Sequence, residues 1–280
     1  TIMDCLDQDL YQPRNKRQQS VMVELFKSWS FIFRLLWISA NSTMVPLLIS
    51  AINDRRLPSL AWYPFDYQQS PYYEILFVNQ IIWYQYIAFV NVHLDGLFST
   101  IMVYIASECK FLSDNLRNIE EFTRERLNRH NCRISDEYNN TLKILVGHHR
   151  GILMIAKETN TIFNISVAYQ MCTSILGICM TMFRLSIAAP LTSEFFLLIC
   201  YQFALFWEIF LYCWCGNEVT FASNEISLAG YESDWVDSSI QFKKDLLFFI
   251  RRTQKPIRLY ALQFFTLSLE TFINILRTSW

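Results

Sequence analysis

The sequence predicts an all-α, polytopic membrane protein, and three observations support this prediction. Among 280 residues, 52% are hydrophobic and only 18% are charged, whereas a soluble domain carries about 25% charged residues. The mean hydropathy of the whole chain is +0.19. Several apolar segments also exceed the ~20 residues with which a helix crosses a hydrocarbon core of about 30 Å. We therefore expect a bundle of membrane-spanning helices.

Five spans and one shorter amphipathic helix follow one another along the chain. Three prolines, Pro58, Pro64 and Pro71, exclude a regular helix between the first two spans, which makes this stretch a structured loop. The second and third spans continue into charged sequence of helical periodicity at residues 107–150. Gly216 is expected to end or kink the fourth span. The predicted elements of this single membrane domain (1–280) are span A at 20–52, span B at 73–106, span C at 152–185, span D at 193–222, the shorter helix at 237–252 and the last helix at 263–280.

Polar residues within the spans give no sign of catalysis. Asp95 and Glu208 are candidates for paired buried carboxyl groups, and an intramembrane carboxylate is more often structural than catalytic. His148 and His149 are adjacent and point to different sides of a helix, and no cysteine pair has the CxxC spacing. We predict no metal site, no cofactor and no enzymatic activity, because no convergent nucleophile or acid/base pair is found.

The last helix has two unlike faces. Its polar residues recur at three- and four-residue spacing and share one face, and apolar residues occupy the other face. Ionisable groups at membrane depth usually face a bundle interior or an aqueous path, so this face predicts a pore lining. A helix lying in the membrane surface is the alternative, and Glu270 could instead be an ion-pair partner that fixes helix packing. The predicted pore-lining residues are Glu270, Asn274, Arg277 and Thr278.

Loop charges predict the orientation of the chain in the membrane. Lys and Arg are abundant before span A, between spans B and C, and between span D and the last helix, and they are scarce in the other two connections. The rich regions are expected to be cytoplasmic by the positive-inside rule. The N-terminal side of the sequence is therefore cytoplasmic and the end of the last helix is extracellular.

The C-terminal part of the sequence resembles the insect odorant receptor family. The resemblance is carried by the runs FLYCWCGNEVTFASNEISLAGYESDWVDSS (210–239) and RRTQKPIRLYALQFFTLSLETFINILRTSW (251–280). Within them lie a Tyr-Cys-x-x-Gly-Asn stretch, a Tyr-x-x-x-Trp, a Gln-Lys-Pro and a Ser-Leu-x-Thr-Phe-x-x-Ile-Leu-Arg-Thr-Ser run. The earlier segments LAWYPFD (60–66) and VGHHRGIL (146–153) are also similar to that family. The resemblance places the family's first two helices and the last residues of its pore helix outside this sequence.

This resemblance implies a seven-helix subunit of a ligand-gated, nonselective cation channel. It further implies a heterotetramer with the odorant receptor co-receptor, located in the plasma membrane of the sensory dendrites of olfactory neurons. In that family the helix preceding the pore helix contributes to an anchor between subunits, which corresponds to residues 237–252 here. The alternative for this segment is a helix on the membrane surface. The implied partners are the co-receptor, a small volatile hydrophobic ligand, the lipid bilayer and permeant cations.

Aromatic and polar residues in the outer halves of the spans are candidates for the odorant pocket. Apolar cavities with few polar groups suit small hydrophobic ligands, and the resemblance implies a pocket in the outer half of the bundle. Ordinary helix packing is the alternative for each residue, since aromatic stripes also pack helices together. The candidates are Phe33, Trp37, Asn41, Phe77, Ile81, Tyr84, Thr173, Met180 and Tyr201.

Other functional classes fit the sequence less well. A seven-helix G-protein-coupled receptor is the main alternative, but the basic connection between spans B and C would then lie outside the cell. The sequence also lacks the Asp/Glu-Arg-Tyr and Asn-Pro-x-x-Tyr motifs at the matching positions. Nucleic-acid binding is not expected, because the net charge is −1 and the charged segments mix both signs.

Overall fold

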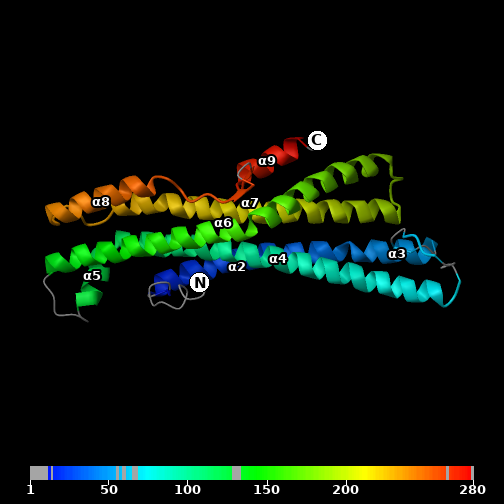
Figure 1. Ribbon diagram of the computed structural model, residues 1–280, viewed down its shortest axis with the longest axis horizontal. Helices are drawn as coiled ribbons and strands as arrows, with labels where there is room; N and C mark the ends of the chain where they lie inside the picture. Colours follow the sequence, from blue (N-terminus) through cyan, green and yellow to red (C-terminus); the bar gives the residue numbers. More distant parts are fainter. Residues whose placement is uncertain are drawn as a thin grey trace. The chain divides into compact units, whose positions relative to one another are not determined.

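The computed structural model describes residues 12–13, 15–54, 57–58, 61–64, 69–127, 134–262 and 265–278. These residues are almost entirely helical, which confirms the predicted all-α class. The elements in chain order are α2 (Lys16–Ser42), α3 (Met44–Asp54), α4 (Tyr72–Arg117), α5 (Ile119–Leu127), α6 (Ile134–Ile187), α7 (Ser193–Tyr231), α8 (Ile240–Thr253), β1 (Tyr260–Ala261), β2 (Phe265–Thr266) and α9 (Leu269–Thr278), as drawn in Figure 1.

Four of the described helical segments are long and apolar enough to cross a membrane. They are Lys16–Ile49, Tyr72–Arg117, Tyr138–Ile187 and Ser193–Tyr231. The first is interrupted at Thr43, close to Pro46, whose missing N–H cannot donate to the preceding turn. The next two continue from spans B and C into the charged segment, as its helical periodicity predicted, and apolar side chains are still buried along one face there, as at Cys109, Leu112 and Leu116.

The helices form two compact units, each with its own core. Unit 1 consists of Thr1–Trp29, Ser99–Ala168 and Cys213–Thr271, and unit 2 consists of Ser30–Phe98, Tyr169–Tyr212 and Phe272–Trp280. In unit 2 many apolar side chains are exposed, among them Phe31, Ile82 and Phe183. Exposed apolar surface of this extent suits contact with lipid.

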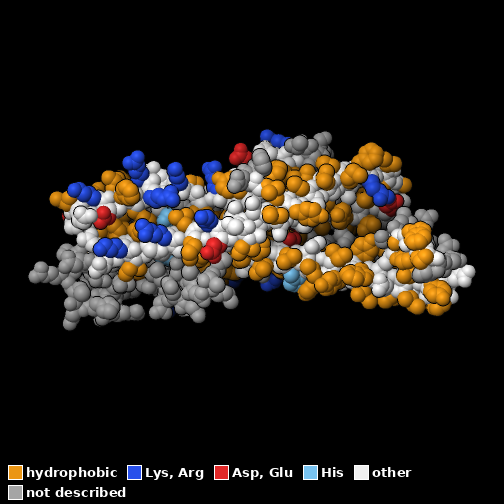
Figure 2. Space-filling model, in the orientation of Figure 1, with side chains coloured by type: hydrophobic (Ala, Val, Ile, Leu, Met, Phe, Trp, Pro, Cys, Tyr) orange, Lys and Arg blue, Asp and Glu red, His pale blue; other side chains and the backbone are white. Residues whose placement is uncertain are grey.

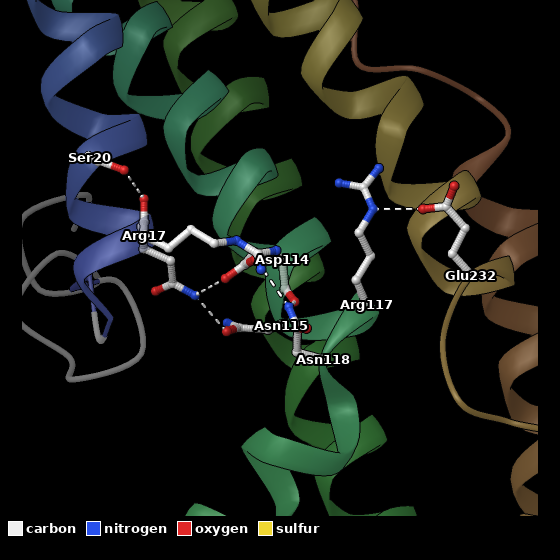
Figure 3. Close-up of polar contacts among 8 residues, drawn as sticks. Arg17, Ser20, Asp114, Asn115, Arg117, Asn118 and Glu232 are labelled. Atoms are coloured by element: carbon white, nitrogen blue, oxygen red, sulfur yellow. Dashed lines mark hydrogen bonds and ion pairs between the residues drawn. The ribbon is translucent and has the colours of Figure 1, made fainter.

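Unit 1 combines a buried apolar core with ion pairs at its surface. Arg17 pairs with Asp114, and Arg117 pairs with Glu232 across 2.7 Å (Figure 3). Helix α8 begins at the N-cap Ser239, whose hydroxyl accepts the Phe242 N–H. In Figure 1, α8 lies along α7, and a Cβ at Gly230 of α7 would be 3.0 Å from Ile250 of α8.

The start of the last helix differs from the prediction. Helix α9 begins at Leu269 rather than at residue 263, because Phe265–Thr266 pairs with Tyr260–Ala261 in a short antiparallel hairpin. The hydroxyl of Ser268 then accepts the Thr271 N–H and caps the helix. The described helix has 10 residues, or about 15 Å, roughly half of a hydrocarbon core.

Gly216 also differs from its prediction, since it lies inside the uninterrupted helix α7 and neither ends nor breaks it. A Cβ at this position would lie 2.3 Å from the carbonyl oxygen of Leu267. The glycine is therefore required by a close approach of two backbones, and the sequence alone does not distinguish this from a helix end.

Candidate functional site

In unit 2, part of the predicted ligand set lies where α2 meets α4. The Phe33 ring packs against Gly96, because a Cβ at Gly96 would lie 2.6 Å from the Phe33 Cε2 atom. The Asn41 amide donates to the Trp37 carbonyl oxygen at 2.7 Å and accepts from Gln85 at 3.0 Å. Helices α2 and α4 are thus held together on either side of Trp37, whose side chain is 47% exposed.

The three ligand candidates on α4 are partly buried. Phe77 stacks on Tyr73 with ring centroids 6.0 Å apart, and Ile81 and Tyr84 are also half-buried. Residues 77, 81 and 84 recur at helical spacing and so share one face of α4. The structure therefore presents these three side chains together.

A second group of candidates lies where α6 meets α7. The Tyr201 hydroxyl would be 3.9 Å from a Cβ at Gly177, and Thr173 and Met180 share the Gly177 face of α6 by their spacing. Thr173 is exposed and donates its hydroxyl to backbone carbonyl oxygens of its own helix. Met180 is 66% exposed and Tyr201 is 44% exposed, so this face is open in the single chain.

A buried polar cluster joins α4, α6 and α7 within unit 2. Asp95 and Glu208 are both buried, and their carboxyl groups interact directly, which confirms the expected pairing. The Tyr212 hydroxyl donates to Asp95, and the Gln170 amide donates to Glu208. The Ser174 hydroxyl donates to the second Glu208 oxygen at 3.0 Å. This cluster fixes the packing of three helices, because buried polar groups are costly unless they are hydrogen-bonded.

An aromatic ladder connects α7 with the last helix, and sequence reasoning missed it. The Trp207 indole N–H donates to the Ile32 carbonyl oxygen at 2.9 Å. Its ring lies between Phe203 and Phe210, at centroid distances of 5.7 Å and 5.3 Å. Phe210 contacts Phe272 of α9 edge to face at 5.5 Å. The spacing of positions 203, 207 and 210 places the three aromatic residues on one face of α7, and the sequence shows this spacing. The spacing does not indicate which helix packs against that face.

Helix α9 exposes most of the predicted pore-lining residues. Glu270, Asn274 and Arg277 are exposed, whereas Ile275 is buried. Thr278 is the last residue of the helix, and its side chain lies outside the described part of the chain. The exposed Glu270 and Arg277 side chains can therefore contact water or another subunit, and the Phe272 and Ile275 side of the helix packs within unit 2.

Unit 1 contains a cavity of about 670 Å³ beside the start of α8. It includes none of the predicted ligand residues, and its carboxyl and hydroxyl groups do not suit a hydrophobic ligand. Its lining residues are Glu120, Tyr138, Ser233, Asp234, Val236, Asp237, Ser238 and Ser239.

Comparison with known proteins decides the family. The family model described as 7tm Odorant receptor matches residues 2–280. The chain belongs to the odorant receptor family. Odorant receptor Or1 of Anopheles gambiae is 26% identical to this receptor, with 97% of this chain and 70% of that relative aligned. Putative odorant receptor 85d of Drosophila melanogaster is 23% identical over 81% of the chain and 53% of that relative.

Solved structures share the fold of this odorant receptor. The olfactory receptor OR5 of Machilis hrabei in complex with eugenol superposes with a TM-score of 0.81, at 18% identity, over 99% of this chain and 71% of that one. A second structure of OR5 superposes with a TM-score of 0.78, at 19% identity, over 95% of this chain and 67% of that one. Together with the family match, this likeness confirms the resemblance seen in the sequence and the prediction of a non-enzymatic, multi-pass membrane protein.

Proposed function

We propose that this odorant receptor is the odorant-binding subunit of a heteromeric, ligand-gated, nonselective cation channel. The observation that carries the proposal is the exposed polar face of α9, on which Glu270, Asn274 and Arg277 recur at helical spacing. Such a face needs water or a polar partner at membrane depth. A carboxylate beside a narrow water column attracts cations.

The exposed surface of α8 supports assembly with other subunits. One face of α8 is buried in unit 1 through Phe242, Leu246 and Phe249. Its other face exposes Leu247 and Phe248, at 69% and 76%. Apolar side chains that remain exposed in a charged region are typical of protein interfaces. The partner that we propose is the odorant receptor co-receptor, in a tetramer.

The distribution of charge supports a cytoplasmic location for α8 and the first half of α6. Figure 2 shows Lys and Arg side chains gathered over these two segments. Basic residues beside membrane spans are characteristic of the cytoplasmic side. We therefore propose a plasma-membrane protein whose N-terminal side is cytoplasmic and whose α9 ends outside the cell.

Co-expression is the experiment that tests the channel. The full-length receptor expressed with the co-receptor is expected to give ligand-evoked cation currents for a panel of small volatile alcohols, esters and phenols. The receptor alone should give little current, because a second subunit contributes to the pore. Equal currents with and without the co-receptor would contradict the heteromeric channel.

The same recordings separate the channel from a G-protein-coupled receptor. Currents should persist in excised patches bathed without GTP, because the conducting pore is part of the complex. Dependence of the current on GTP would favour the G-protein-coupled alternative.

We further propose that the odorant contacts the nine candidate residues in unit 2. Alanine at Trp37 or Tyr84 is expected to raise the half-maximal odorant concentration by about tenfold, as the loss of a well-packed aromatic contact would. Unitary conductance should not change. The matched control is Tyr86→Ala, on a more exposed face of α4. Unchanged potency in both variants would remove these two residues from the pocket.

Cysteine substitution tests the proposed pore face of α9. Asn274→Cys in the assembled channel should react with a water-soluble thiol reagent, and the reaction should reduce the current. Ile275→Cys is the control, because Ile275 is buried in unit 2. Protection of both positions would indicate that the polar face packs against a neighbouring subunit. Glu270→Gln should in addition alter relative cation permeability.

A further inference from the structure

The chain between α8 and α9 contains little helix, and its backbone needs hydrogen-bond partners from other elements. Helix α8 ends at Thr253 and α9 begins at Leu269. In the described part of this connector, the paired residues of β1 and β2 satisfy only part of the backbone. Non-helical backbone near a membrane is tolerated where protein groups satisfy its N–H and C=O groups.

Two asparagines of α6 supply such partners. The Asn160 side-chain oxygen accepts the Tyr260 N–H at 2.8 Å, and the Asn164 side-chain oxygen accepts the Leu262 N–H at 2.6 Å. The asparagines are four residues apart and so share one face of α6. Asparagine is a poor residue for a helix interior. Its presence at both positions is explained by these contacts.

Helix α7 holds the connector from a second direction within unit 1. The Ser223 hydroxyl accepts the Ile257 N–H at 2.9 Å, and the Thr220 hydroxyl donates to the Ile257 carbonyl oxygen at 3.2 Å. Further along, Leu267 lies against the backbone of Gly216. The connector is therefore fixed at both ends to α7 and in its middle to α6.

Hydrogen bonds continue from the hairpin into the first turn of α9. Tyr260, which is bound by Asn160, pairs with Thr266 across the hairpin. The Thr266 carbonyl oxygen accepts the Thr271 hydroxyl at 2.7 Å. An unbroken series of hydrogen bonds thus runs from α6 through β1 and β2 to α9, all within unit 1.

We propose that Asn160 and Asn164 are positioning residues for the pore helix, which hold the connector against α6 and transmit displacement of α6 to the start of α9. The transmission of displacement to α9 rests on the proposed channel function. The holding of the connector is a property of the chain itself and does not depend on conduction. Both halves can be tested separately.

Hydrogen–deuterium exchange on the purified full-length protein tests the holding of the connector. In the double variant Asn160→Ala, Asn164→Ala the amides of residues 260–262 and 265–266 should exchange at least about tenfold faster than in the wild type, because two of their acceptors are lost. The matched control is Asn140→Ala, the same substitution at an exposed position of α6. Unaltered exchange in the double variant would overturn the proposal.

Single-channel recording with the co-receptor tests the transmission. Each single variant and the double variant should have a lower ligand-evoked open probability than the wild type. In the double variant the half-maximal odorant concentration should rise by about tenfold, because two hydrogen bonds are lost. Unitary conductance and surface abundance should match Asn140→Ala. Faster exchange with unchanged gating would overturn the coupling. Absence of current in the wild type would instead refute the channel, and the exchange result would stand.

Discussion

Alanine at Gly216 is expected to abolish most of the ligand-evoked current of the proposed channel. The added Cβ would lie 2.3 Å from the Leu267 carbonyl oxygen and 2.6 Å from the Leu267 Cβ. A backbone carbonyl cannot turn away as the end of a flexible side chain can, so Leu267 must move, and α9 begins two residues later. Overpacking of this kind costs about 1–3 kcal/mol. If this cost falls on the open channel, the current should fall by about 5- to 150-fold in whole-cell recordings of the receptor with the proposed co-receptor.

The control for this experiment is Gly147→Ala in α6. Among the residues that the structure describes, no atom lies within 4 Å of a Cβ at Gly147, apart from its chain neighbours and the backbone of the adjacent helical turns. Alanine in a helix interior is favoured over glycine by about 0.5–1 kcal/mol, so the control should reach the cell surface normally and conduct. A Gly216→Ala receptor with wild-type current would show that the contact with Leu267 is not maintained in the assembled channel.

Alanine at His148 is expected to lower the free energy of unfolding more than any other single substitution proposed for this receptor. His148 of α6 and Glu108 of α4 are buried in unit 1 at 0% and 1% exposure, with Nε2 and Oε2 2.9 Å apart. The substitution leaves the Glu108 carboxyl group buried without its imidazole partner. Removal of one partner from a buried pair typically costs roughly 3–5 kcal/mol. At about 2.1 cal/mol/K of unfolding entropy per residue, the melting temperature of the detergent-purified protein should fall by roughly 5–9 °C.

Two further variants test the cause of this loss. His93→Ala removes an exposed histidine from α4 and should leave the melting temperature nearly unchanged. Replacement of both Glu108 and His148 by leucine should recover much of the stability, because an apolar pair of similar volume needs no polar partners. Similar melting temperatures for the His93 and His148 variants would show that the pair contributes little.

Periodicity and composition predicted the helices of this receptor well, because both arise from local chemistry. The amphipathic helix expected at 237–252 is found as Ile240–Thr253, where buried Phe242, Leu246 and Phe249 recur at helical spacing. The pairing of Asp95 with Glu208 was also accessible from the sequence. Two carboxyl groups within apolar spans have few ways to be accommodated other than by each other and by nearby polar groups.

Features that depend on contacts between distant segments were not predicted. The hairpin before α9 forms because residues 260–261 and 265–266 pair with each other and Asn160 and Asn164 satisfy neighbouring backbone groups, about 100 positions away in the sequence. The apolar residues in this segment fit a helical pattern equally well. Similarly, the aromatic stripe of α7 gave no indication that Phe210 would contact Phe272. The sequence also did not indicate how the ligand candidates are brought together. Phe33 approaches Gly96 and Tyr201 approaches Gly177, because neither glycine has a side chain that would block an aromatic residue.

The length of α6 gives it the properties of a mechanical lever. It is a single helix of 54 residues, or about 80 Å at 1.5 Å per residue. The part of α6 in unit 1, residues 134–168, is about 52 Å long, and a tilt of about 5° around one of its ends would move the other end by roughly 4.5 Å, more than the length of a hydrogen bond. Bilayer thickness is one of the forces that tilt long apolar helices. Bilayer thickness therefore becomes a physical variable that can set the tilt of this helix, and with it the position of the groups that the helix carries.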